Sequence, residues 1–435
     1  MTRFLLHPVL AVVLVALSAH PARGQLVPVP IDVGQPAGVY IDADGVLRTR
    51  QSGNEEMAAQ RLRARALNAP SKAQDLTCVS LPRLVEQVKS LTEASKPLPD
   101  DVRFLSGLTQ IRYVFVYPQE HDLLIAGPSE PYDASGKSEP HGKVTGRPVL
   151  HLDDLVMALR SPRTFGCSLD PHPDSLNRCN AVMKEYASAT LAARMNALKD
   201  AMGPQQVRMF GAPGGSRMAF VTVAADYKLK RLILGLDAMP VPGVGSPVDN
   251  TRAAGNRFWF EADYAPLLVS ADDDAFELRG PRLVLKAGAF SFDTKGATET
   301  SKAFARRFSD KFPQLATVVP LFADLQNLAD LSVVANLIRK DRLDQKAGVD
   351  LSWLTAGDHY KPAPIPTPTT AETLVNYTNG SLVAGGVTLN AASVVAAERE
   401  RDAKGTLKPV MFRPSAGADR WFATRSAGET ASPKH

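Results

Sequence analysis

The stretch that decides the fold runs from Gln110 to Pro171 and reads QIRYVFVYPQEHDLLIAGPSEPYDASGKSEPHGKVTGRPVLHLDDLVMALRSPRTFGCSLDP. It begins with an apolar run at residues 111–117 that is rich in β-branched and aromatic residues, as buried strands are. A polar break separates this run from a second one at residues 123–126. Two short runs around such a break predict an antiparallel hairpin. A loop follows, and the sequence then predicts a helix over residues 149–160.

The regions before and after this stretch repeat the alternation of short apolar runs, turns and helical patterns. Residues 38–48 place two apolar runs around Asp42-Ala43-Asp44-Gly45, which predicts a second hairpin. Residues 321–339 are apolar around most of the helix circumference, so we expect a central, buried helix. The interruptions at Asp324, Asn327 and Asp330 are too frequent for a helix in a bilayer. The other predicted elements are helices over residues 55–67, 81–91, 175–199 (one helix or a pair), 226–236 and 300–312, strands over residues 207–210 and 217–223, an antiparallel meander of four short strands between residues 257 and 286, and a last hairpin at residues 382–389.

Together these patterns predict an α+β fold: a mixed, largely antiparallel sheet with packed helices, in a single large domain. A chain of 435 residues, 44% of them hydrophobic, is long enough to bury a sizeable core. The predicted segments are a signal peptide at residues 1–24, an extended segment at 25–37, the domain at 38–389 and a mostly disordered tail at 390–435, where charged and small residues dominate.

The first residues, MTRFLLHPVLAVVLVALSAHPARGQ, have the organisation of an export signal. Arg3 gives a basic start, residues 4–17 are apolar, and Ala22-Arg23-Gly24 offers small residues for cleavage. The apolar stretch is interrupted by His7-Pro8 and is short for a membrane span. We therefore expect cleavage after Gly24, a mature chain without a transmembrane segment, and a periplasmic or extracellular location.

The charge and the cysteine content limit which partners the protein can bind and which disulfide bonds it can form. The formal net charge is +5, and because Arg3 and Arg23 leave with the signal, the loss of two positive charges brings it to +3. Basic and acidic residues are interspersed, so no basic stripe indicates a nucleic acid partner. Three cysteines, Cys78, Cys167 and Cys179, are too few for a disulfide scaffold. Either Cys167 and Cys179 pair, or all three are small buried residues.

Eight stretches taken together are similar to those of a known family. They are GVYIDADGVLR, YVFVYPQEHDLLIAGPSEPY, TGRPVLHLDDLVMALR, GCSLDP, ADYKLKRLILGL, RFWFEADY, FADLQNLADLSVVANLIRKD and LVAGGVTL, and they cover residues 38–389. With them the chain resembles a family of secreted proteins, known mainly from planctomycete-type bacteria and catalogued as a domain of unknown function. The resemblance implies an exported protein with one continuous family domain, and it implies no activity. The chain departs from the family after CSLDP, where it has His172-Pro173-Asp174 instead of an uncharged, threonine-containing segment.

A Cys/His peptidase is one catalytic alternative, with Cys167, His141 and Asp170 as candidate residues. His141 follows the predicted hairpin and Cys167 follows the predicted helix, which is similar to the order in caspase-like folds. A thiolate nucleophile needs a nearby base and an electropositive setting. The segment before Cys167 gives only a short strand, and His141 lies in a polar loop. We therefore expect Cys167 to be a packed residue at a strand-to-helix junction.

A metal site is the other catalytic alternative, with His151, Asp153 and His172 as candidate ligands beside Asp170. These residue types suit a transition metal. His151 and Asp153 are two positions apart, however, and would not share a helix face. Asp153 or Asp154 is more simply explained as an acid at the start of a helix, where it interacts favourably with the helix dipole.

The interpretation that we favour is an exported, non-catalytic protein that binds an envelope component, an extracellular partner or a small ligand. An exported hydrolase, either Cys/His peptidase-like or metal-dependent, is the alternative. The sequence identifies no cofactor: residues 211–216 are glycine-rich but lack the Gly-Lys-Ser/Thr of a phosphate loop and predict a turn. An enzyme should bring His141, Cys167 and Asp170 to one cleft. A binding protein should expose an apolar patch, for which residues 258–260 are the candidate.

Overall fold

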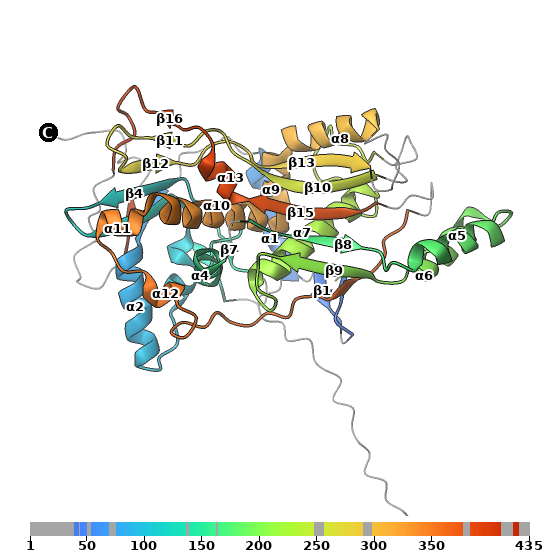
Figure 1. The fold of residues 1–435 in the computed structure, drawn as a ribbon, viewed down its shortest axis with the longest axis horizontal. Coiled ribbons are helices and arrows are strands. Elements are labelled where there is room, and N and C mark those ends of the chain that lie inside the picture. Colours follow the sequence, from blue (N-terminus) through green and yellow to red (C-terminus); the bar gives the residue numbers. More distant parts are fainter. Residues whose placement is uncertain are drawn as a thin grey trace, which may run out of the picture.

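Figure 1 shows the fold in a computed structural model, which describes residues 39–42, 44–49, 54–68, 75–135, 139–161, 164–247, 256–289, 298–376, 383–409 and 421–425. The predicted signal peptide (1–24) and extended segment (25–37) lie outside these residues and remain predictions. The described part contains helices α1–α13 and mixed sheets that are not closed into a barrel. The predicted α+β class is therefore confirmed.

The first sheet has eight strands within the described residues, in the order β1-β2-β14-β9-β8-β15-β10-β13. Neighbours in this sheet are antiparallel except for the β2–β14 and β10–β15 pairs. The hairpin predicted at residues 38–48 forms one edge, with Val39 opposite Thr49. The strands are β1 (Val39–Ile41), β2 (Val46–Thr49), β14 (Thr370–Ala371), β9 (Gln205–Phe210), β8 (Thr164–Asp170), β15 (Gly385–Asn390), β10 (Asn256–Asp263) and β13 (Arg282–Ala289).

A second sheet of seven described strands, in the order β16-β11-β12-β4-β5-β3-β17, contains the hairpin predicted at residues 111–126. Tyr113 lies opposite Ala126 and Tyr117 opposite Asp122, so the predicted β4–β5 hairpin is confirmed. The strands are β16 (Glu400–Arg401), β11 (Leu268–Val269), β12 (Ala275–Glu277), β4 (Tyr113–Tyr117), β5 (Asp122–Ser129), β3 (Asp75–Ser80) and β17 (Phe422–Arg425), and a separate pair is formed by β6 (Tyr132–Asp133) and β7 (His141–Gly142).

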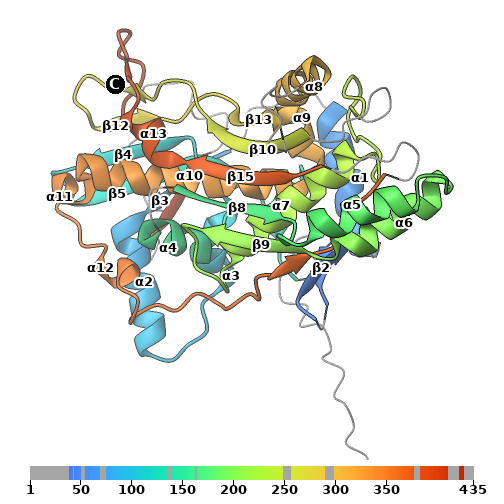
Figure 2. The same cartoon turned by 45° about the vertical axis from the view of Figure 1, so that its right-hand side comes forward.

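Helix α10 (Pro320–Asp341) crosses the centre of the molecule in both views (Figures 1 and 2). It begins at Pro320, because proline fits the first helical position, where no backbone donor is needed. Every residue from Leu321 to Ile338 is buried, which confirms the predicted central helix. Among the described residues, α10 is also the one helix long and apolar enough to cross a membrane, but its apolar window lies wholly inside the protein. It packs against α4 (Leu152–Arg160), α7 (Arg217–Ile233), α9 (Phe312–Val318) and α13 (Ala391–Ala396).

Most of the remaining helices lie where the sequence predicts them. Helix α2 starts after Ser80, whose hydroxyl accepts a hydrogen bond from Arg83 N, and Pro82 occupies its first turn. Residues 175–199 form a helix pair, which projects beyond β8 and β9 in both views (Figures 1 and 2). The helices are α1 (Asn54–Asn68), α2 (Leu81–Glu93), α3 (Asp100–Arg103), α5 (Ser175–Glu185), α6 (Leu191–Met202), α8 (Glu299–Asp310), α11 (Leu343–Ala347) and α12 (Ser352–Thr355).

The strand predicted at residues 217–223 is wrong, because these residues form the first two turns of α7. The segment is buried all round, and an apolar run buried on every side has no periodicity that separates a helix from a strand. The Ser216 hydroxyl starts the helix by accepting a hydrogen bond from Ala219 N at 3.2 Å. The helix predicted at residues 226–236 is the second half of the same element.

The antiparallel meander predicted between residues 257 and 286 is also wrong in its pairing. β10 pairs with β13 in the first sheet, whereas β11 pairs with β12 in the second sheet. Neighbouring strands usually pair with each other, but here the chain leaves one sheet and returns to it. The last predicted hairpin, at residues 382–389, is instead the single strand β15 between β8 and β10, with residue 382 outside the described part.

The apolar patch expected at residues 258–260 is not exposed. Phe258 and Phe260 are fully buried, since alternate residues of β10 face the core. Their rings pack in an aromatic cluster with Phe304, Phe308, Phe312 and Phe322. The patch prediction is therefore wrong.

Three regular elements fall inside the tail predicted at residues 390–435. They are α13, β16 and β17, and β17 adds an antiparallel strand to β3. Trp421, just before β17, is buried, so a few apolar residues hold this segment in place. For these elements the predicted disorder is wrong, because composition averaged over a long segment hides a short apolar strand.

Candidate functional site

The candidate site lies where α4, α7 and α10 contact one another near the centre of the molecule (Figure 1). Helix α4 starts after the extended residue His151, and its first turn carries Asp153 and Asp154. Acids are favourable there because the helix dipole is positive at its N-terminus. Helix α7 starts at Arg217, directly after its capping residue Ser216. The two helix starts bring a carboxylate and a guanidinium together.

The Arg217 network is a buried group of one guanidinium and three carboxylates. Arg217 donates through Nη1 to Asp154 Oδ2, through Nη2 and Nε to Glu139 Oε1 (3.1 Å from Nε), and through Nη2 to Asp324 Oδ1 of α10 (2.8 Å). Each of the four side chains is at most 4% exposed. Three separate parts of the chain are therefore tied to the first residue of α7.

The network contains more acid than base. Glu139 Oε2, Asp154 Oδ1 and Asp324 Oδ2 have no hydrogen-bond partner among the described residues. Burial raises the pKa of all three carboxyl groups, against the lowering effect of Arg217. Burial would lower the pKa of Arg217, but the carboxylates hold it well above its usual value. Because unpaired buried charge is costly, the network retains protons at pH values at which exposed carboxylates have lost theirs.

His151 joins this network to an open cavity. Its Nε2 lies 3.1 Å from Glu139 Oε1 without forming a hydrogen bond. Burial and the positive charge of Arg217 lower the pKa of His151 to about 4, so the imidazole is neutral near pH 7. The ring packs edge-on against Phe104, with 5.1 Å between ring centroids. The neutral imidazole therefore lies between the network and the cavity, with its Nε2 closed to solvent beside Glu139.

The His151 cavity has a volume of about 380 Å³. One wall is apolar, and a cation lies over it: the Arg103 guanidinium is 4.9 Å from the centroid of the Phe104 ring. Asp153 is already occupied, because its Oδ1 accepts from Tyr360 Oη (2.6 Å) and its Oδ2 from Ala363 N (3.1 Å). The lining residues are Pro97, Leu98, Arg103, Phe104, His151, Asp153, Tyr360, Lys361 and Ala363.

The structure brings three of the six candidate residues into this region. His151 and Asp153 line the same cavity. His141 lies close behind the network, with its Nδ1 2.8 Å from the backbone oxygen of Glu139. Within the described residues, no group of three or more histidine, cysteine, aspartate or glutamate side chains is placed to hold a metal ion.

The other three candidates lie elsewhere and have different neighbours. Cys167 is the central residue of β8 and not at a strand-to-helix junction, so that detail of the prediction is wrong. Its thiol is buried against Thr222 O (3.7 Å), and burial raises its pKa well above the usual value. Asp170, at the end of β8, accepts from Ser168 Oγ (2.8 Å). His172 is exposed on the connection to α5, 3.5 Å from Asp174.

The two cysteines whose pairing the sequence left undecided do not form a disulfide bond. Cys167 and Cys179 are both free thiols, the first in β8 and the second in α5. The Cys179 thiol is half-buried and faces Leu198 O at 3.9 Å. The alternative in which these two residues pair does not hold in this structure.

Sequence reasoning missed the residues that make the network. Arg217 and Glu139 were assigned no role, and Asp154 was noted only as a residue of the helix start. Asp324 was noted only as an interruption of an apolar helix. That interruption is nevertheless a usable signal, because a carboxylate on a helix that is apolar all round must find a buried partner.

Comparison with known proteins gives a match to part of the chain. Residues 167–246 match a family described as protein of unknown function (DUF1598). The match extends from β8 through α7 to the segment beyond it, so it includes Arg217 but not His151 or the three carboxylates. It supports the resemblance to a domain of unknown function over these residues. No curated protein and no solved structure matches the chain.

Proposed function

We propose that this protein is exported and binds a small organic anion with an apolar body in the His151 cavity, without a chemical step. The observation that carries the proposal is the lining of that cavity. It combines two cations, Arg103 and Lys361, with the neutral imidazole of His151 and an apolar wall. Ligand sites typically combine an apolar lining with a few polar groups that fix orientation.

Charge complementarity selects an anion. Both oxygens of Asp153, the one acidic residue of the lining, already accept hydrogen bonds from Tyr360 and Ala363. Asp153 keeps its negative charge, so the two cations of the lining, Arg103 and Lys361, leave one positive charge in excess. Because Arg103 also donates to Asp100 outside the lining (3.1 Å), Lys361 is the cation left for a ligand. A carboxylate fits the cations, and an aromatic or aliphatic body fits Leu98 and Phe104.

Binding without chemistry is favoured by the properties of His151. A general base works best when its pKa lies near the working pH. The pKa of His151 is lowered to about 4, so its imidazole is a weak base at neutral pH. It is better suited to accept or donate one hydrogen bond to a bound ligand.

Export is supported by the sequence of the first residues. A basic start, an apolar run and Ala22-Arg23-Gly24 are typical of a cleaved signal. N-terminal sequencing of the protein recovered outside the cytoplasm should begin at Gln25. Recovery of the chain in a membrane fraction with Met1 retained would contradict export by this route.

The binding proposal is tested with benzoate, by calorimetry and by the shift in melting temperature of the mature chain. Benzyl alcohol, which lacks the charge, and acetate, which lacks the apolar body, are the matched ligands. We expect saturable binding of benzoate only. Replacing Lys361 by glutamine should weaken it about fivefold, since a charge-assisted contact contributes about 1 kcal/mol.

Lys302→Gln is the control variant, because Lys302 is exposed on α8 and does not line the His151 cavity. It should bind benzoate as the unmodified protein does. Equal binding of benzoate and benzyl alcohol, or an unchanged affinity in Lys361→Gln, would overturn the proposal.

A further inference from the structure

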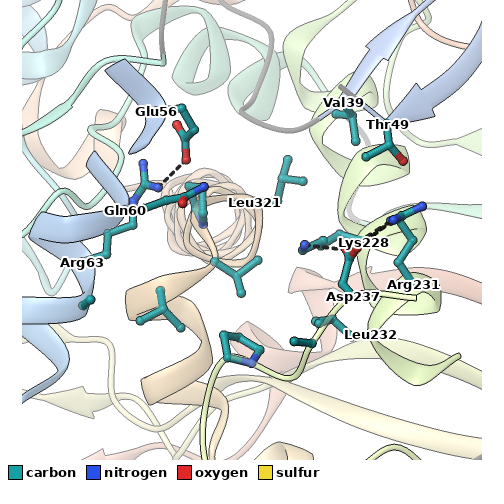
Figure 3. Close-up of a pocket in the computed structure, with 16 residues that line it drawn as sticks. Val39, Thr49, Glu56, Gln60, Arg63, Lys228, Arg231, Leu232, Asp237 and Leu321 are labelled. Carbon is teal, nitrogen blue, oxygen red and sulfur yellow. Dashed lines mark hydrogen bonds and ion pairs between the residues drawn. The ribbon is translucent and has the colours of Figure 1, made fainter. Parts of the chain in front are cut away.

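A second cavity of about 440 Å³ lies away from the His151 cavity, between α1, the C-terminal half of α7 and the start of α10. We call it the α1–α7 cavity. Figure 3 shows Glu56, Gln60 and Arg63 on one side, Lys228, Arg231 and Asp237 on the other, and Leu321 between the two groups. Its two polar walls carry different charge.

The α1 wall offers an acceptor. Arg63 is almost fully buried and donates to Glu56 Oε1 (2.7 Å) and to Gly146 O (2.9 Å). The second oxygen of Glu56, Oε2, has no hydrogen-bond partner among the described residues, although the side chain is only 10% exposed. Oε2 is closed to solvent in this structure. Because a buried carboxylate oxygen without a donor is costly, a ligand donor that met Oε2 after a turn of the Glu56 side chain would stabilise this wall.

The α7 wall offers positive charge. Lys228 Nζ lies 2.7 Å from Asp237 Oδ2, and Arg231 Nη2 lies 2.7 Å from Asp237 Oδ1. Two cations therefore share one carboxylate, which leaves one positive charge in excess. Lys228 is 30% exposed and retains donors that Asp237 does not use. An anion placed here would be attracted without displacing Asp237.

The floor of the cavity is the start of α10, and it adds to the positive potential. Val319, Pro320 and Leu321 line the cavity, and the helix has no side-chain cap. An uncapped helix of 22 residues presents partial positive charge at its first turn, which favours anions. The helix start alone would not define a ligand, but it acts on the same side as the excess charge of α7.

We infer that the α1–α7 cavity binds a small hydroxylated carboxylic acid, of the kind represented by sugar acids. The carboxylate of the ligand lies towards Lys228 and the start of α10, and Glu56 turns its Oε2 towards the cavity to accept a hydrogen bond from a ligand hydroxyl. A hydroxyl suits Glu56 better than an ammonium, because Arg63 already neutralises that carboxylate and would repel a second cation. This site is separate from the one in the proposed function and does not depend on it.

The experiment measures binding of gluconate to the mature chain by calorimetry. Sorbitol carries the hydroxyls without the carboxylate, and hexanoate carries the carboxylate without the hydroxyls. We expect saturable binding of gluconate, with sorbitol and hexanoate at least tenfold weaker. Benzoate should not compete with gluconate, since it is assigned to the other cavity. Sorbitol binding as tightly as gluconate, or gluconate failing to bind, would overturn the inference.

Two variants locate the site. Lys228→Gln leaves Asp237 bound to Arg231, so the fold is kept, and gluconate affinity should fall about tenfold. Glu56→Gln should remove the preference for gluconate over hexanoate, because the second oxygen of Glu56 becomes an amide donor. Lys302→Gln should bind gluconate normally. If Glu56→Gln does not fold, Lys228→Gln decides alone: unchanged gluconate affinity in that variant places the ligand elsewhere.

Discussion

Helix α7 carries two buried charge groups that differ in balance. In its middle, Asp226 and Lys230 form a one-to-one pair in which Lys230 Nζ lies 3.2 Å from Asp226 Oδ2. Asp226 Oδ1 also accepts from Gly386 N (2.6 Å), and Lys230 donates to Gln205 Oε1 (3.1 Å). At the start of the same helix, Arg217 faces three carboxylates. Both groups are buried, but only the first is neutral.

The difference separates a structural role from the proposed binding role. The Asp226–Lys230 pair connects α7 to β15 and β9, and no cavity opens on it among those described. Both groups contain a carboxylate oxygen without a hydrogen-bond donor, since Asp226 Oδ2 is one as well, but only the Arg217 network carries more acid than base and reaches the His151 cavity. Because a buried charge imbalance costs free energy, packing alone does not account for it. Charge balance, rather than burial, therefore distinguishes the two groups.

The largest effect is expected from breaking the balanced pair. Lys230→Met leaves Asp226 buried and uncompensated, and we expect it to lower the free energy of unfolding by about 3–5 kcal/mol. Urea denaturation measures the loss. The double variant Asp226→Asn/Lys230→Met should regain a large part of it, while Lys302→Met, at an exposed ion pair, should stay within about 0.5 kcal/mol of the unmodified protein. A loss below about 1 kcal/mol for Lys230→Met would show that the pair is not structural.

The next effect concerns the pH dependence that His151 gives to the network. The pKa of His151 is lowered to about 4 in the folded chain, whereas an unfolded histidine titrates near 6.5. Between these values the unfolded chain binds a proton that the folded chain does not, so the free energy of unfolding falls as the pH is lowered through this window. The groups that face the imidazole, namely Arg217, Glu139, Asp153, Asp154 and Asp324, set the size of the shift.

In the His151→Gln variant, this fall in the free energy of unfolding at low pH is absent. From pH 7 to pH 4 the stability difference should therefore move in favour of the variant, by up to about 3 kcal/mol. Urea denaturation at a series of pH values measures it. His172→Gln, at an exposed side chain, should follow the unmodified protein. Parallel pH profiles for His151→Gln and the unmodified protein would contradict the lowered pKa.

The local elements of the fold could be predicted from the sequence, and their long-range pairing could not. The β1–β2 and β4–β5 hairpins and the central helix α10 follow from turns and apolar periodicity. The position of β15 between β8 and β10 depends on residues more than a hundred positions apart, which no local pattern encodes. The prediction for the start of α7 was wrong for a different reason, since a segment buried on all sides shows no amphipathic period.

The site could be predicted only in part. His151 and Asp153 were predicted as candidate metal ligands, and the structure places both on one cavity. The Arg217 network could not be predicted, because Arg217 and Asp324 lie far from His151 and Asp153 in the sequence. Their meeting depends on the packing of α4, α7 and α10. A sequence shows that a carboxylate lies on a buried helix, but not which cation reaches it.

A moderate effect is expected at Gly385, which tests how closely the balanced pair is packed. A Cβ at this position would lie 2.1 Å from Asp226 Oδ1 and 2.5 Å from the Lys230 stem. Gly385→Ala should therefore lower the free energy of unfolding by about 1–3 kcal/mol. Gly214→Ala is the matched control, because a Cβ there meets no other atom within 4 Å. Equal stability of the two variants would mean that the pair can move aside.

The smallest effect is expected from removing one acid of the unbalanced network. Asp324→Asn keeps the shape of the side chain and one acceptor for Arg217, while it removes a charge that the network holds in excess. We expect a change of less than about 1 kcal/mol near pH 7. The matched variant is Asp330→Asn on the same helix, where Asp330 accepts from Arg282 (3.2 Å) and Tyr264 (2.8 Å). It should cost about 2–4 kcal/mol, because a buried guanidinium loses its counter-charge.

The pH dependence of Asp324→Asn gives the sharper test of the imbalance. Burial raises the pKa of Asp324, so the folded chain holds a proton that the unfolded chain has lost, and this contribution to stability disappears as the pH rises through the raised pKa. Asparagine cannot lose that proton. Relative to the unmodified protein, the variant should therefore be more stable at pH 8 than at pH 5. If Asp324→Asn is instead as damaging as Asp330→Asn at both pH values, all three carboxylates of the network are needed as charges, and the contrast with the Asp226–Lys230 pair is lost.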